Sequence, residues 1–124
     1  LVPTKNIGLQ IAGKIASAGV AAKFFAGTEL DLKADIVKVI TMHSAKGLEF
    51  PIIVLAGFDN GTYQQPDQSE MVDIYEEWLT NERKLLYVGM TRAMRGLMVV
   101  TTESCQHEVL MALSSENWVV EEVT

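Results

Sequence analysis

The stretch that decides the fold covers residues 35–58, DIVKVITMHSAKGLEFPIIVLAGF, in which two apolar runs flank a charged loop. The runs at residues 35–42 and 51–58 are rich in β-branched side chains and are apolar on both faces. Runs of this kind are typical of parallel strands that are covered on two sides. We therefore expect two central strands of a parallel sheet, joined by the loop HSAKGLE at residues 43–49.

Predicted helices and strands alternate along the rest of the chain. Apolar spacing and flanking turn residues predict helices at residues 7–19, 70–95 and 104–113 and strands at residues 20–27, 97–102 and 117–123. In the long helix we expect Ser69 as the N-terminal cap, a break near Thr80 and Gly96 as the stop. This alternation predicts an α/β fold, in which a parallel sheet with right-handed crossovers carries helices on both faces.

The composition is that of one globular domain. A chain of 124 residues with 48% hydrophobic and 21% charged residues is long enough to bury a single core. No apolar run approaches the roughly 18 residues that a membrane span needs, so we expect no membrane partner. Cys105 is the only cysteine, which excludes an internal disulfide and a cysteine metal cluster and suits a cytoplasmic location.

The charge of the chain limits how it can contact a nucleic acid. The formal net charge is −6, which argues against a domain that grips a phosphate backbone over its whole surface. Acidic residues gather in residues 67–82 and 116–122, so residues 43–46 and 83–95 are relatively basic. We therefore expect any nucleic-acid contact to be confined to one positive edge.

The loop at residues 43–49 carries ionisable residues where a link between buried strands usually carries turn residues. In open α/β sheets, ligands bind beyond the carboxyl ends of the strands, and this loop follows such an end. Gly47 gives the chain freedom to reverse, and the amides of a tight turn can meet a phosphate. His43 and Lys46 can donate to phosphate oxygens, and Glu49 can accept from a sugar hydroxyl. The alternative is that Lys46 and Glu49 are solvated and that His43 ends the strand.

The second charged segment is NERKLLYVGMTRAMRG at residues 81–96. Helical spacing places Leu85, Val88, Gly89 and Arg92 on one side, so Arg92 projects near an apolar face. A guanidinium there needs an anionic partner, which is either a carboxylate of the same protein or a ligand phosphate. Gly89 in mid-helix costs about 1 kcal/mol relative to alanine, which indicates that something packs closely against it.

Aromatic and sulfur-containing residues give weaker indications. Tyr87 lies on another side of the helix and is either a core residue or a platform for a base. Trp78 and Trp118 have no basic cluster beside them in the sequence, so we interpret them as packing residues. Cys105 and His107 are two positions apart, but no further ligands accompany them, so we expect neither a metal site nor a cysteine nucleophile.

Two segments in this order, VKVITMHSAKGLEFPIIVLAG and NERKLLYVGMTRAMRGLMVV, closely resemble motifs V and VI of UvrD/Rep/PcrA-type superfamily 1 DNA helicases. The opening LVPTKN and the helix after it resemble the segment that precedes motif V. The resemblance implies that residues 1–124 are the second RecA-like motor domain of such a helicase, and a fragment of a larger chain. It also implies a P-loop NTPase-like domain that lacks the P-loop.

The resemblance implies a nucleotide site that is shared between two domains. ATP and Mg²⁺ would be bound mainly by a first RecA-like domain, which is a partner of this one. Arg92 resembles the arginine finger that stabilises charge on the transferring phosphoryl group. Glu49 resembles the glutamate that contacts the nucleotide sugar, and Gly47 would lie beside the nucleotide. No GxxxxGK[ST] phosphate-binding loop occurs in the sequence, so the isolated chain is expected not to hydrolyse ATP.

The resemblance also implies a DNA contact. His43 resembles a residue on the backbone of single-stranded DNA, and Ser44 and Lys46 line the same single-strand or single-strand to double-strand junction. Lys5 stands where relatives carry a DNA-contacting asparagine, which is a departure from the family pattern.

The resemblance therefore predicts part of an ATP-dependent DNA helicase or translocase, with 3′ to 5′ movement and a role in repair, replication restart or recombination. Two alternatives remain at this point. The first is a non-catalytic module that only binds DNA or a protein. The second is the motor part of a helicase–nuclease.

Overall fold

The fold is given by a computed structural model that describes residues 1–63, 65–67 and 72–123. The predicted cap Ser69 and the predicted start of the long helix at Glu70 lie outside these residues. In the part that is described, the elements follow in the order α1 (Lys5–Ser17), β1 (Ala22–Phe24), β2 (Val37–Val39), β3 (Phe50–Leu55), α2 (Val72–Met90), β4 (Ala93–Val99) and α3 (Glu108–Met111).

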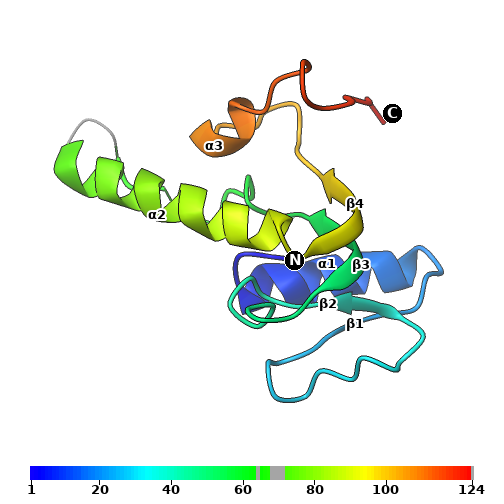
Figure 1. The fold of residues 1–124 in the computed structure, drawn as a ribbon. Coiled ribbons are helices and arrows are strands. Elements are labelled where there is room, and N and C mark those ends of the chain that lie inside the picture. The colour runs from blue at the N-terminus through cyan, green and yellow to red at the C-terminus, as the bar shows by residue number, and fades with distance from the viewer. Residues whose placement is uncertain (64, 68–71, 124) are drawn as a thin grey trace.

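All strand pairs are parallel, as the sequence predicts. β1 pairs with β2 and β3 pairs with β4. In Figure 1, α1, β1 and β2 form the lower part of the molecule and α2, β3, β4 and α3 form the upper part, with the N-terminus between them. The predicted parallel pairing is therefore confirmed, but helices and strands alternate only from β3 onward, because β1, β2 and β3 follow one another without a helix between them.

The first two residues join the two strand pairs. The Val2 amide donates to the Ile40 carbonyl at 3.0 Å, and the Met42 amide donates to the Val2 carbonyl at 3.1 Å. On the other side, the Ala56 amide donates to the Leu1 carbonyl at 3.1 Å. Leu1 and Val2 thus lie as a short strand between the line of β2 and the line of β3.

α1 begins two residues earlier than predicted, because Thr4 caps it. The Thr4 hydroxyl oxygen accepts from the Ile7 amide at 3.3 Å. The helix ends just before Gly19, which has φ +90° and so supplies the left-handed stop that the sequence indicates. Its buried side carries Ala12, which packs with Val2 and Val39 in one core cluster.

The helices cover the two faces of the strands unequally. On one face of β3, Ile53 and Leu55 pack with Leu86 of α2 and Leu110 of α3 in the main core. On the opposite face, which α1 covers over β1 and β2, Ile52 is 70% exposed and Val54 is 39% exposed. The expectation that β3 is covered on both sides is therefore wrong in the described chain, because α1 packs on β1 and β2 and leaves Ile52 and Val54 of β3 exposed.

α2 is continuous and shorter than predicted. It has no break at Thr80, and it ends at Met90 instead of Arg95. β4 already begins at Ala93, and Gly96, the predicted helix stop, pairs with Ile52 inside the strand. The helical spacing continues past Met90 in the sequence, but the segment from Ala93 pairs with β3 as a strand. This pairing ends the helix.

The C-terminal segment has less regular structure than predicted. The predicted helix at residues 104–113 is reduced to α3, and residues 117–123 form no strand in the described chain. His107 is the reason for the late start, because its imidazole Nδ1 accepts from the Leu110 amide at 3.4 Å and so caps α3. Among the helices that are described, none combines the length and the apolar character needed to cross a membrane.

Candidate functional site

The loop after β2 forms a tight turn. The Thr41 hydroxyl oxygen lies 3.0 Å from the Ser44 hydroxyl oxygen and accepts from the Ser44 amide at 3.3 Å. The Ala45 amide donates to the Thr41 carbonyl at 3.2 Å, and the Leu48 amide donates to the Ala45 carbonyl at 3.0 Å. Ala45 is buried with Phe25 and Ile40, so the turn is anchored to the core.

The turn presents its ionisable side chains to solvent. His43, Lys46 and Glu49 are exposed, and Ser44 is half-buried because its hydroxyl faces Thr41. Gly47 has φ +81°, a left-handed conformation that favours glycine, so the predicted reversal of the chain at Gly47 is confirmed. The side chains predicted to meet DNA therefore stand on a hydrogen-bonded turn that Ala45 anchors to the core.

Gly89 brings the middle of α2 against the base of this loop. A Cβ built on Gly89 would lie 2.1 Å from the Met42 Cε atom and 2.8 Å from the Met42 Sδ atom. Met42 immediately precedes His43 and is itself buried. The close packing that the sequence predicts at Gly89 is thus confirmed, and Met42 is the residue that packs there.

Arg92 lies in the turn between α2 and β4, not within the helix as predicted. Its amide donates to the Gly89 carbonyl at 3.2 Å, and its carbonyl accepts from the Phe50 amide at 2.9 Å. Phe50 follows Glu49 directly, so this hydrogen bond brings Glu49 and Arg92, the two residues predicted to contact the nucleotide, close together where β3 and β4 begin. They lie at the amino ends of these two strands, whereas His43 and Ser44 follow the carboxyl end of β2.

The guanidinium of Arg92 has few protein partners. Its Nε atom is buried and has no hydrogen-bond partner among the described residues. One Nη atom lies 3.4 Å from the Thr91 hydroxyl oxygen. Within the described part of the chain, the recorded ion pair joins His107 to Glu82 and does not involve Arg92. The alternative in which a carboxylate of this chain holds Arg92 therefore finds no partner in residues 1–63, 65–67 and 72–123.

The structure contradicts the interpretation of Tyr87 and confirms that of Trp78. Tyr87 is 68% exposed, so its interpretation as a core residue is wrong and its use as a stacking platform stays open. Trp78 packs on Tyr75 and His107, with ring centroids 5.9 and 5.6 Å apart, which confirms the packing interpretation.

A buried polar cluster was missed in the sequence. The Tyr63 hydroxyl donates to the Glu82 carboxylate, with its oxygen 2.6 and 2.7 Å from the two carboxylate oxygens, and His107 Nε2 lies 3.2 Å from the same group. Glu82 is 4% exposed and His107 is fully buried. Because His107 Nδ1 accepts from the Leu110 amide, Nε2 is the nitrogen that carries the proton toward Glu82. Burial, together with the hydrogen bond and charge of Glu82, raises the pKa of Tyr63.

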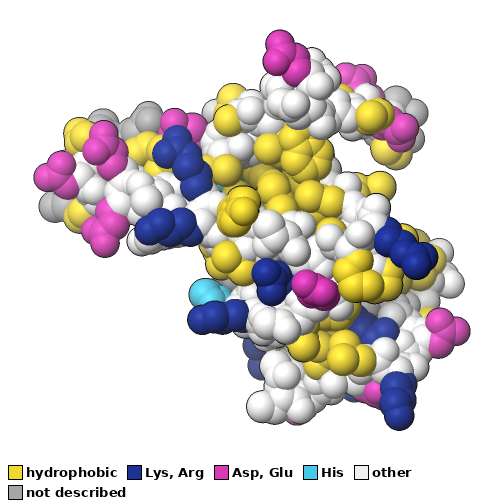
Figure 2. Space-filling model, in the orientation of Figure 1, with side chains coloured by type: hydrophobic (Ala, Val, Ile, Leu, Met, Phe, Trp, Pro, Cys, Tyr) yellow, Lys and Arg dark blue, Asp and Glu magenta, His cyan; other side chains and the backbone are white. Residues whose placement is uncertain are grey.

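Charged side chains are distributed unevenly over the surface. Figure 2 shows acidic side chains at the left end, over the start of α2, and at the top, over the C-terminal segment. Lys and Arg side chains spread over the middle and lower part of the same face, next to one exposed histidine. Among the described residues, no three His, Cys, Asp or Glu side chains form a group that could hold a metal ion.

Comparison with protein families and sequences gives consistent matches. The family model described as UvrD-like helicase C-terminal domain matches residues 25–104. DNA helicase II of Escherichia coli strain K12 is 40% identical over 76 residues, which are 61% of this chain and 10% of that protein. ATP-dependent DNA helicase UvrD1 of Mycobacterium tuberculosis strain CDC 1551 is 36% identical over 93 residues, which cover 68% of this chain and 12% of that protein. The chain thus spans about a tenth of the length of these relatives.

A solved structure shows the same fold. The C-terminal domain of a possible DNA helicase from Lactobacillus plantarum WCFS1 superimposes with a TM-score of 0.61 at 22% sequence identity. The match covers 83% of this chain and 54% of that one. At this identity the similarity concerns the fold alone, and it confirms the predicted RecA-like α/β class.

Proposed function

The chain belongs to the family of UvrD-like helicase C-terminal domains, and from this premise we propose that it supplies Arg92 to an ATP site in a DNA helicase or translocase. The rest of that site would come from a first RecA-like domain. In this proposal the isolated chain does not hydrolyse ATP, because it has no phosphate-binding loop.

The observation that carries the proposal is the unpartnered guanidinium of Arg92. A guanidinium keeps its charge in proteins, and a buried donor without an acceptor costs about 1–3 kcal/mol. The buried Nε of Arg92 has no acceptor in the described chain, and the neighbouring Nη contacts only a hydroxyl. Phosphate oxygens are acceptors whose geometry suits the guanidinium fork. A phosphate that approaches the start of β4 would therefore satisfy Arg92.

The neighbours of Arg92 fit a nucleotide better than an isolated phosphate. The Phe50 amide holds the Arg92 carbonyl, and this bond places Glu49 next to Arg92 along the sheet. The exposed carboxylate of Glu49 can accept from a sugar hydroxyl, and the exposed backbone at Gly47 leaves room beside it. The described residues offer no metal cluster, so Mg²⁺ would be held by the partner domain.

The role proposed for Arg92 is catalytic. Two guanidinium N–H groups aimed at the oxygens of the transferring phosphoryl group would stabilise the charge that develops there. Arginines in this role accelerate phosphoryl transfer by about 10³ to 10⁵. The bond between Phe50 and Arg92 would fix the backbone on which this side chain turns.

The contact between Gly89 and Met42 would couple the nucleotide to DNA. In this proposal His43, Ser44 and Lys46 meet the backbone of single-stranded DNA from the turn after β2. Gly89 packs on Met42 at the base of that turn, and its carbonyl holds the Arg92 amide. If the end of α2 moves when Arg92 binds the phosphate, this movement would therefore displace Met42, the residue that precedes His43.

The test is ATP hydrolysis by the full-length protein that contains this chain, measured with and without single-stranded DNA. We expect hydrolysis that DNA stimulates strongly. Hydrolysis that is absent under both conditions, in a protein shown to be folded, would favour the alternative of a non-catalytic binding module. Nuclease activity in the same protein would instead identify the motor of a helicase–nuclease.

A further inference from the structure

Thr91 lies between the end of α2 at Met90 and the proposed catalytic residue Arg92, and it is exposed. Its amide donates to the Tyr87 carbonyl at 3.0 Å, and its hydroxyl donates to the Val88 carbonyl at 2.9 Å. The carbonyls in the last turn of a helix have no partners within the regular helix, and a threonine hydroxyl can supply one. Thr91 therefore fixes its own side chain to the end of α2.

The Val88 carbonyl is open to this hydroxyl because the backbone departs from the helical pattern. In a regular α-helix the Arg92 amide would donate to the Val88 carbonyl, four residues earlier. Here the Arg92 amide donates to the Gly89 carbonyl at 3.2 Å. The Thr91 hydroxyl thus takes the place of the Arg92 amide and satisfies an acceptor that the end of the helix leaves open.

The orientation of the Thr91 hydroxyl determines how it meets Arg92. A hydroxyl has one proton and two lone pairs, and the Val88 carbonyl takes the proton. The oxygen can therefore only accept from Arg92, whose guanidinium carries donors alone. One Nη atom of Arg92 lies 3.4 Å from this oxygen, and this is the hydrogen bond that the guanidinium makes within the described residues.

The length of this contact suits a group that must exchange partners. Hydrogen bonds from a guanidinium to a carboxylate are typically about 2.7–2.9 Å long and roughly twice as strong as neutral ones. A contact of 3.4 Å to a neutral hydroxyl is near the upper limit for a hydrogen bond and is weak. A phosphate can therefore take the guanidinium from Thr91 at little cost, whereas a carboxylate at the same place would compete with the phosphate.

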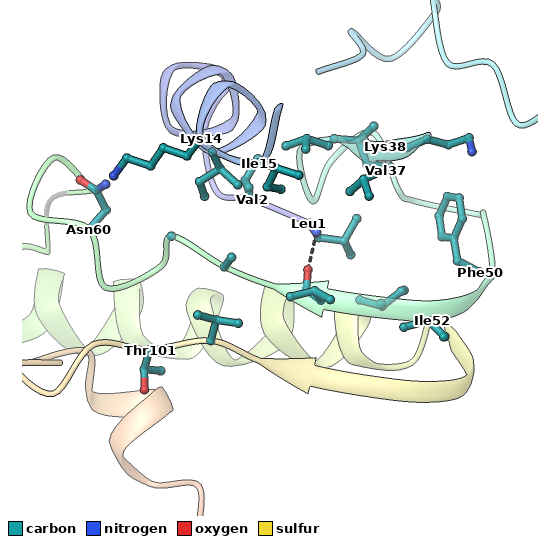
Figure 3. Close-up of a pocket in the computed structure, with 18 of the residues that line it drawn as sticks. Leu1, Val2, Lys14, Ile15, Val37, Lys38, Phe50, Ile52, Asn60 and Thr101 are labelled. Atoms are coloured by element: carbon teal, nitrogen blue, oxygen red, sulfur yellow. Dashed lines mark hydrogen bonds between the residues drawn. The ribbon is translucent and has the colours of Figure 1, made fainter. Parts of the chain in front are cut away.

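The backbone of Arg92 is fixed on both sides. Its amide is bound to the Gly89 carbonyl, and its carbonyl accepts from the Phe50 amide at 2.9 Å. Figure 3 shows Phe50 where β3 begins. The rotation of the side chain remains, and arginine is among the side chains that lose most conformational entropy when they are ordered. A contact that orders the guanidinium in advance removes part of this cost.

We propose that Thr91 is a positioning residue for phosphoryl transfer: its hydroxyl, held by the Val88 carbonyl, aims the guanidinium of Arg92 at the phosphate before the nucleotide arrives. The inference rests on the catalytic role proposed for Arg92 and deepens it. Donors that are oriented in advance stabilise a transition state without reorganisation, and a displacement of about 1 Å can cost about a hundredfold in rate. Thr91 itself touches neither the phosphate nor the sugar in this proposal.

Substitutions can separate the hydroxyl from the shape of the side chain. Thr91→Val keeps the branched shape and the restricted χ1 rotamers but removes the hydroxyl. Thr91→Ala removes the hydroxyl in a smaller side chain, and Thr91→Ser keeps the hydroxyl and removes only the methyl group. Thr80→Val is the matched control, because Thr80 is also exposed and lies in the middle of α2.

The test measures ATP hydrolysis by the full-length protein in the presence of single-stranded DNA. We expect Thr91→Val and Thr91→Ala to lower kcat by about ten- to a hundredfold, while KM for ATP changes only a few-fold, because the contact orients Arg92 and does not bind the nucleotide. Thr91→Ser should keep kcat within a few-fold of the unmodified protein, and Thr80→Val should leave kcat unchanged.

A second background distinguishes positioning from a structural role. In a protein that already carries Arg92→Ala, Thr91→Val should not lower kcat further, because no guanidinium remains to be aimed. An equal loss in both backgrounds would overturn the proposal, since Thr91 would then only support the end of α2. Unchanged kcat in Thr91→Val, together with a large loss in Arg92→Ala, would also overturn it and leave the role of Arg92 intact. Unchanged kcat in Arg92→Ala would contradict the proposed function, and this inference with it.

Discussion

Gly89 of α2 lies so close to Met42 that a Cβ on this glycine would fall 2.1 Å from the Met42 Cε atom. This contact joins two segments that are far apart in the sequence. Met42 leads into the turn with His43 and Lys46, and the Gly89 carbonyl holds the Arg92 amide. The contact is therefore where the proposed DNA turn and the proposed catalytic arginine are mechanically connected.

Replacing Gly89 with alanine should destabilise the chain. The added methyl group must displace Met42 from a core where it is 4% exposed, and such overpacking costs about 1–3 kcal/mol. Alanine recovers about 1 kcal/mol through its higher helix propensity. We expect a net loss of about 1 kcal/mol in the free energy of unfolding, measured by chemical denaturation.

Two comparisons separate crowding from helix propensity. Gly13→Ala in α1 meets nothing within 4 Å, so it should stabilise the chain by up to about 1 kcal/mol. In a chain that already carries Met42→Ala, the Gly89→Ala change should turn from destabilising to stabilising. If its effect is the same with and without Met42, the two residues are not coupled and the contact does not have the role proposed here.

Tyr63 should contribute to stability through Glu82. The variant Tyr63→Phe leaves the buried Glu82 carboxylate without the hydroxyl that contacts both of its oxygens. We expect a loss of about 1–3 kcal/mol in the free energy of unfolding at pH 7. Tyr87→Phe is the matched control, because Tyr87 is exposed and should tolerate the change. An equal effect of the two substitutions would show that the Glu82 cluster is not specifically stabilising.

The raised pKa of Tyr63 predicts that the chain loses stability at alkaline pH. The pKa of Tyr63 is raised above its ordinary value of 10.0, chiefly by burial and further by Glu82. Above pH 10 the unfolded chain releases this proton while the folded chain keeps it, so the unfolded state binds fewer protons and stability falls as the pH rises. Denaturation of the unmodified chain between pH 9 and about 11 should show this fall, and Tyr63→Phe should reduce it. A parallel pH dependence of the two chains would contradict the assignment.

Much of the fold could be predicted from local patterns. The helix that became α1 and the run that contains β3 are both visible as periodicities in the sequence, and Gly19 and Gly47 mark a stop and a reversal correctly. The end of α2 could not be predicted in this way. Residues 91–95 continue the helical spacing, but the Phe50 amide, which is far away in the sequence, binds the Arg92 carbonyl and starts β4.

Only part of the site could be predicted from the sequence, because its contacts join residues that are far apart along the chain. Gly89 indicated a close contact, since a glycine in mid-helix is costly, but nothing in the sequence named Met42 as its partner. The Glu82 cluster was missed because its members are 19 and 25 residues from Glu82. One signal was available, because Glu82 shares a helix face with Leu79 and Leu86, both of which are buried.

The isolated chain should bind single-stranded DNA weakly. Its net charge of −6 opposes the phosphate backbone, and the proposed contact is limited to the turn after β2. Lys46→Ala should weaken binding further and reduce the salt slope by about 0.7, as expected for one lost phosphate contact on a single strand. Lys33→Ala, an exposed lysine outside the turn, is the control in a salt titration. Tight binding that salt does not weaken would contradict this interface.

Hydrolysis of ATP by the full-length protein, compared between Arg92→Ala and the unmodified form, tests the role of the arginine. We expect the substitution to lower turnover by on the order of 10³, while nucleotide affinity changes only a few-fold. Arg95→Ala, at an exposed position three residues along β4, should leave turnover nearly unchanged. Turnover that is unaffected by Arg92→Ala, in a folded protein that hydrolyses ATP, would contradict the proposal that this domain supplies the catalytic arginine.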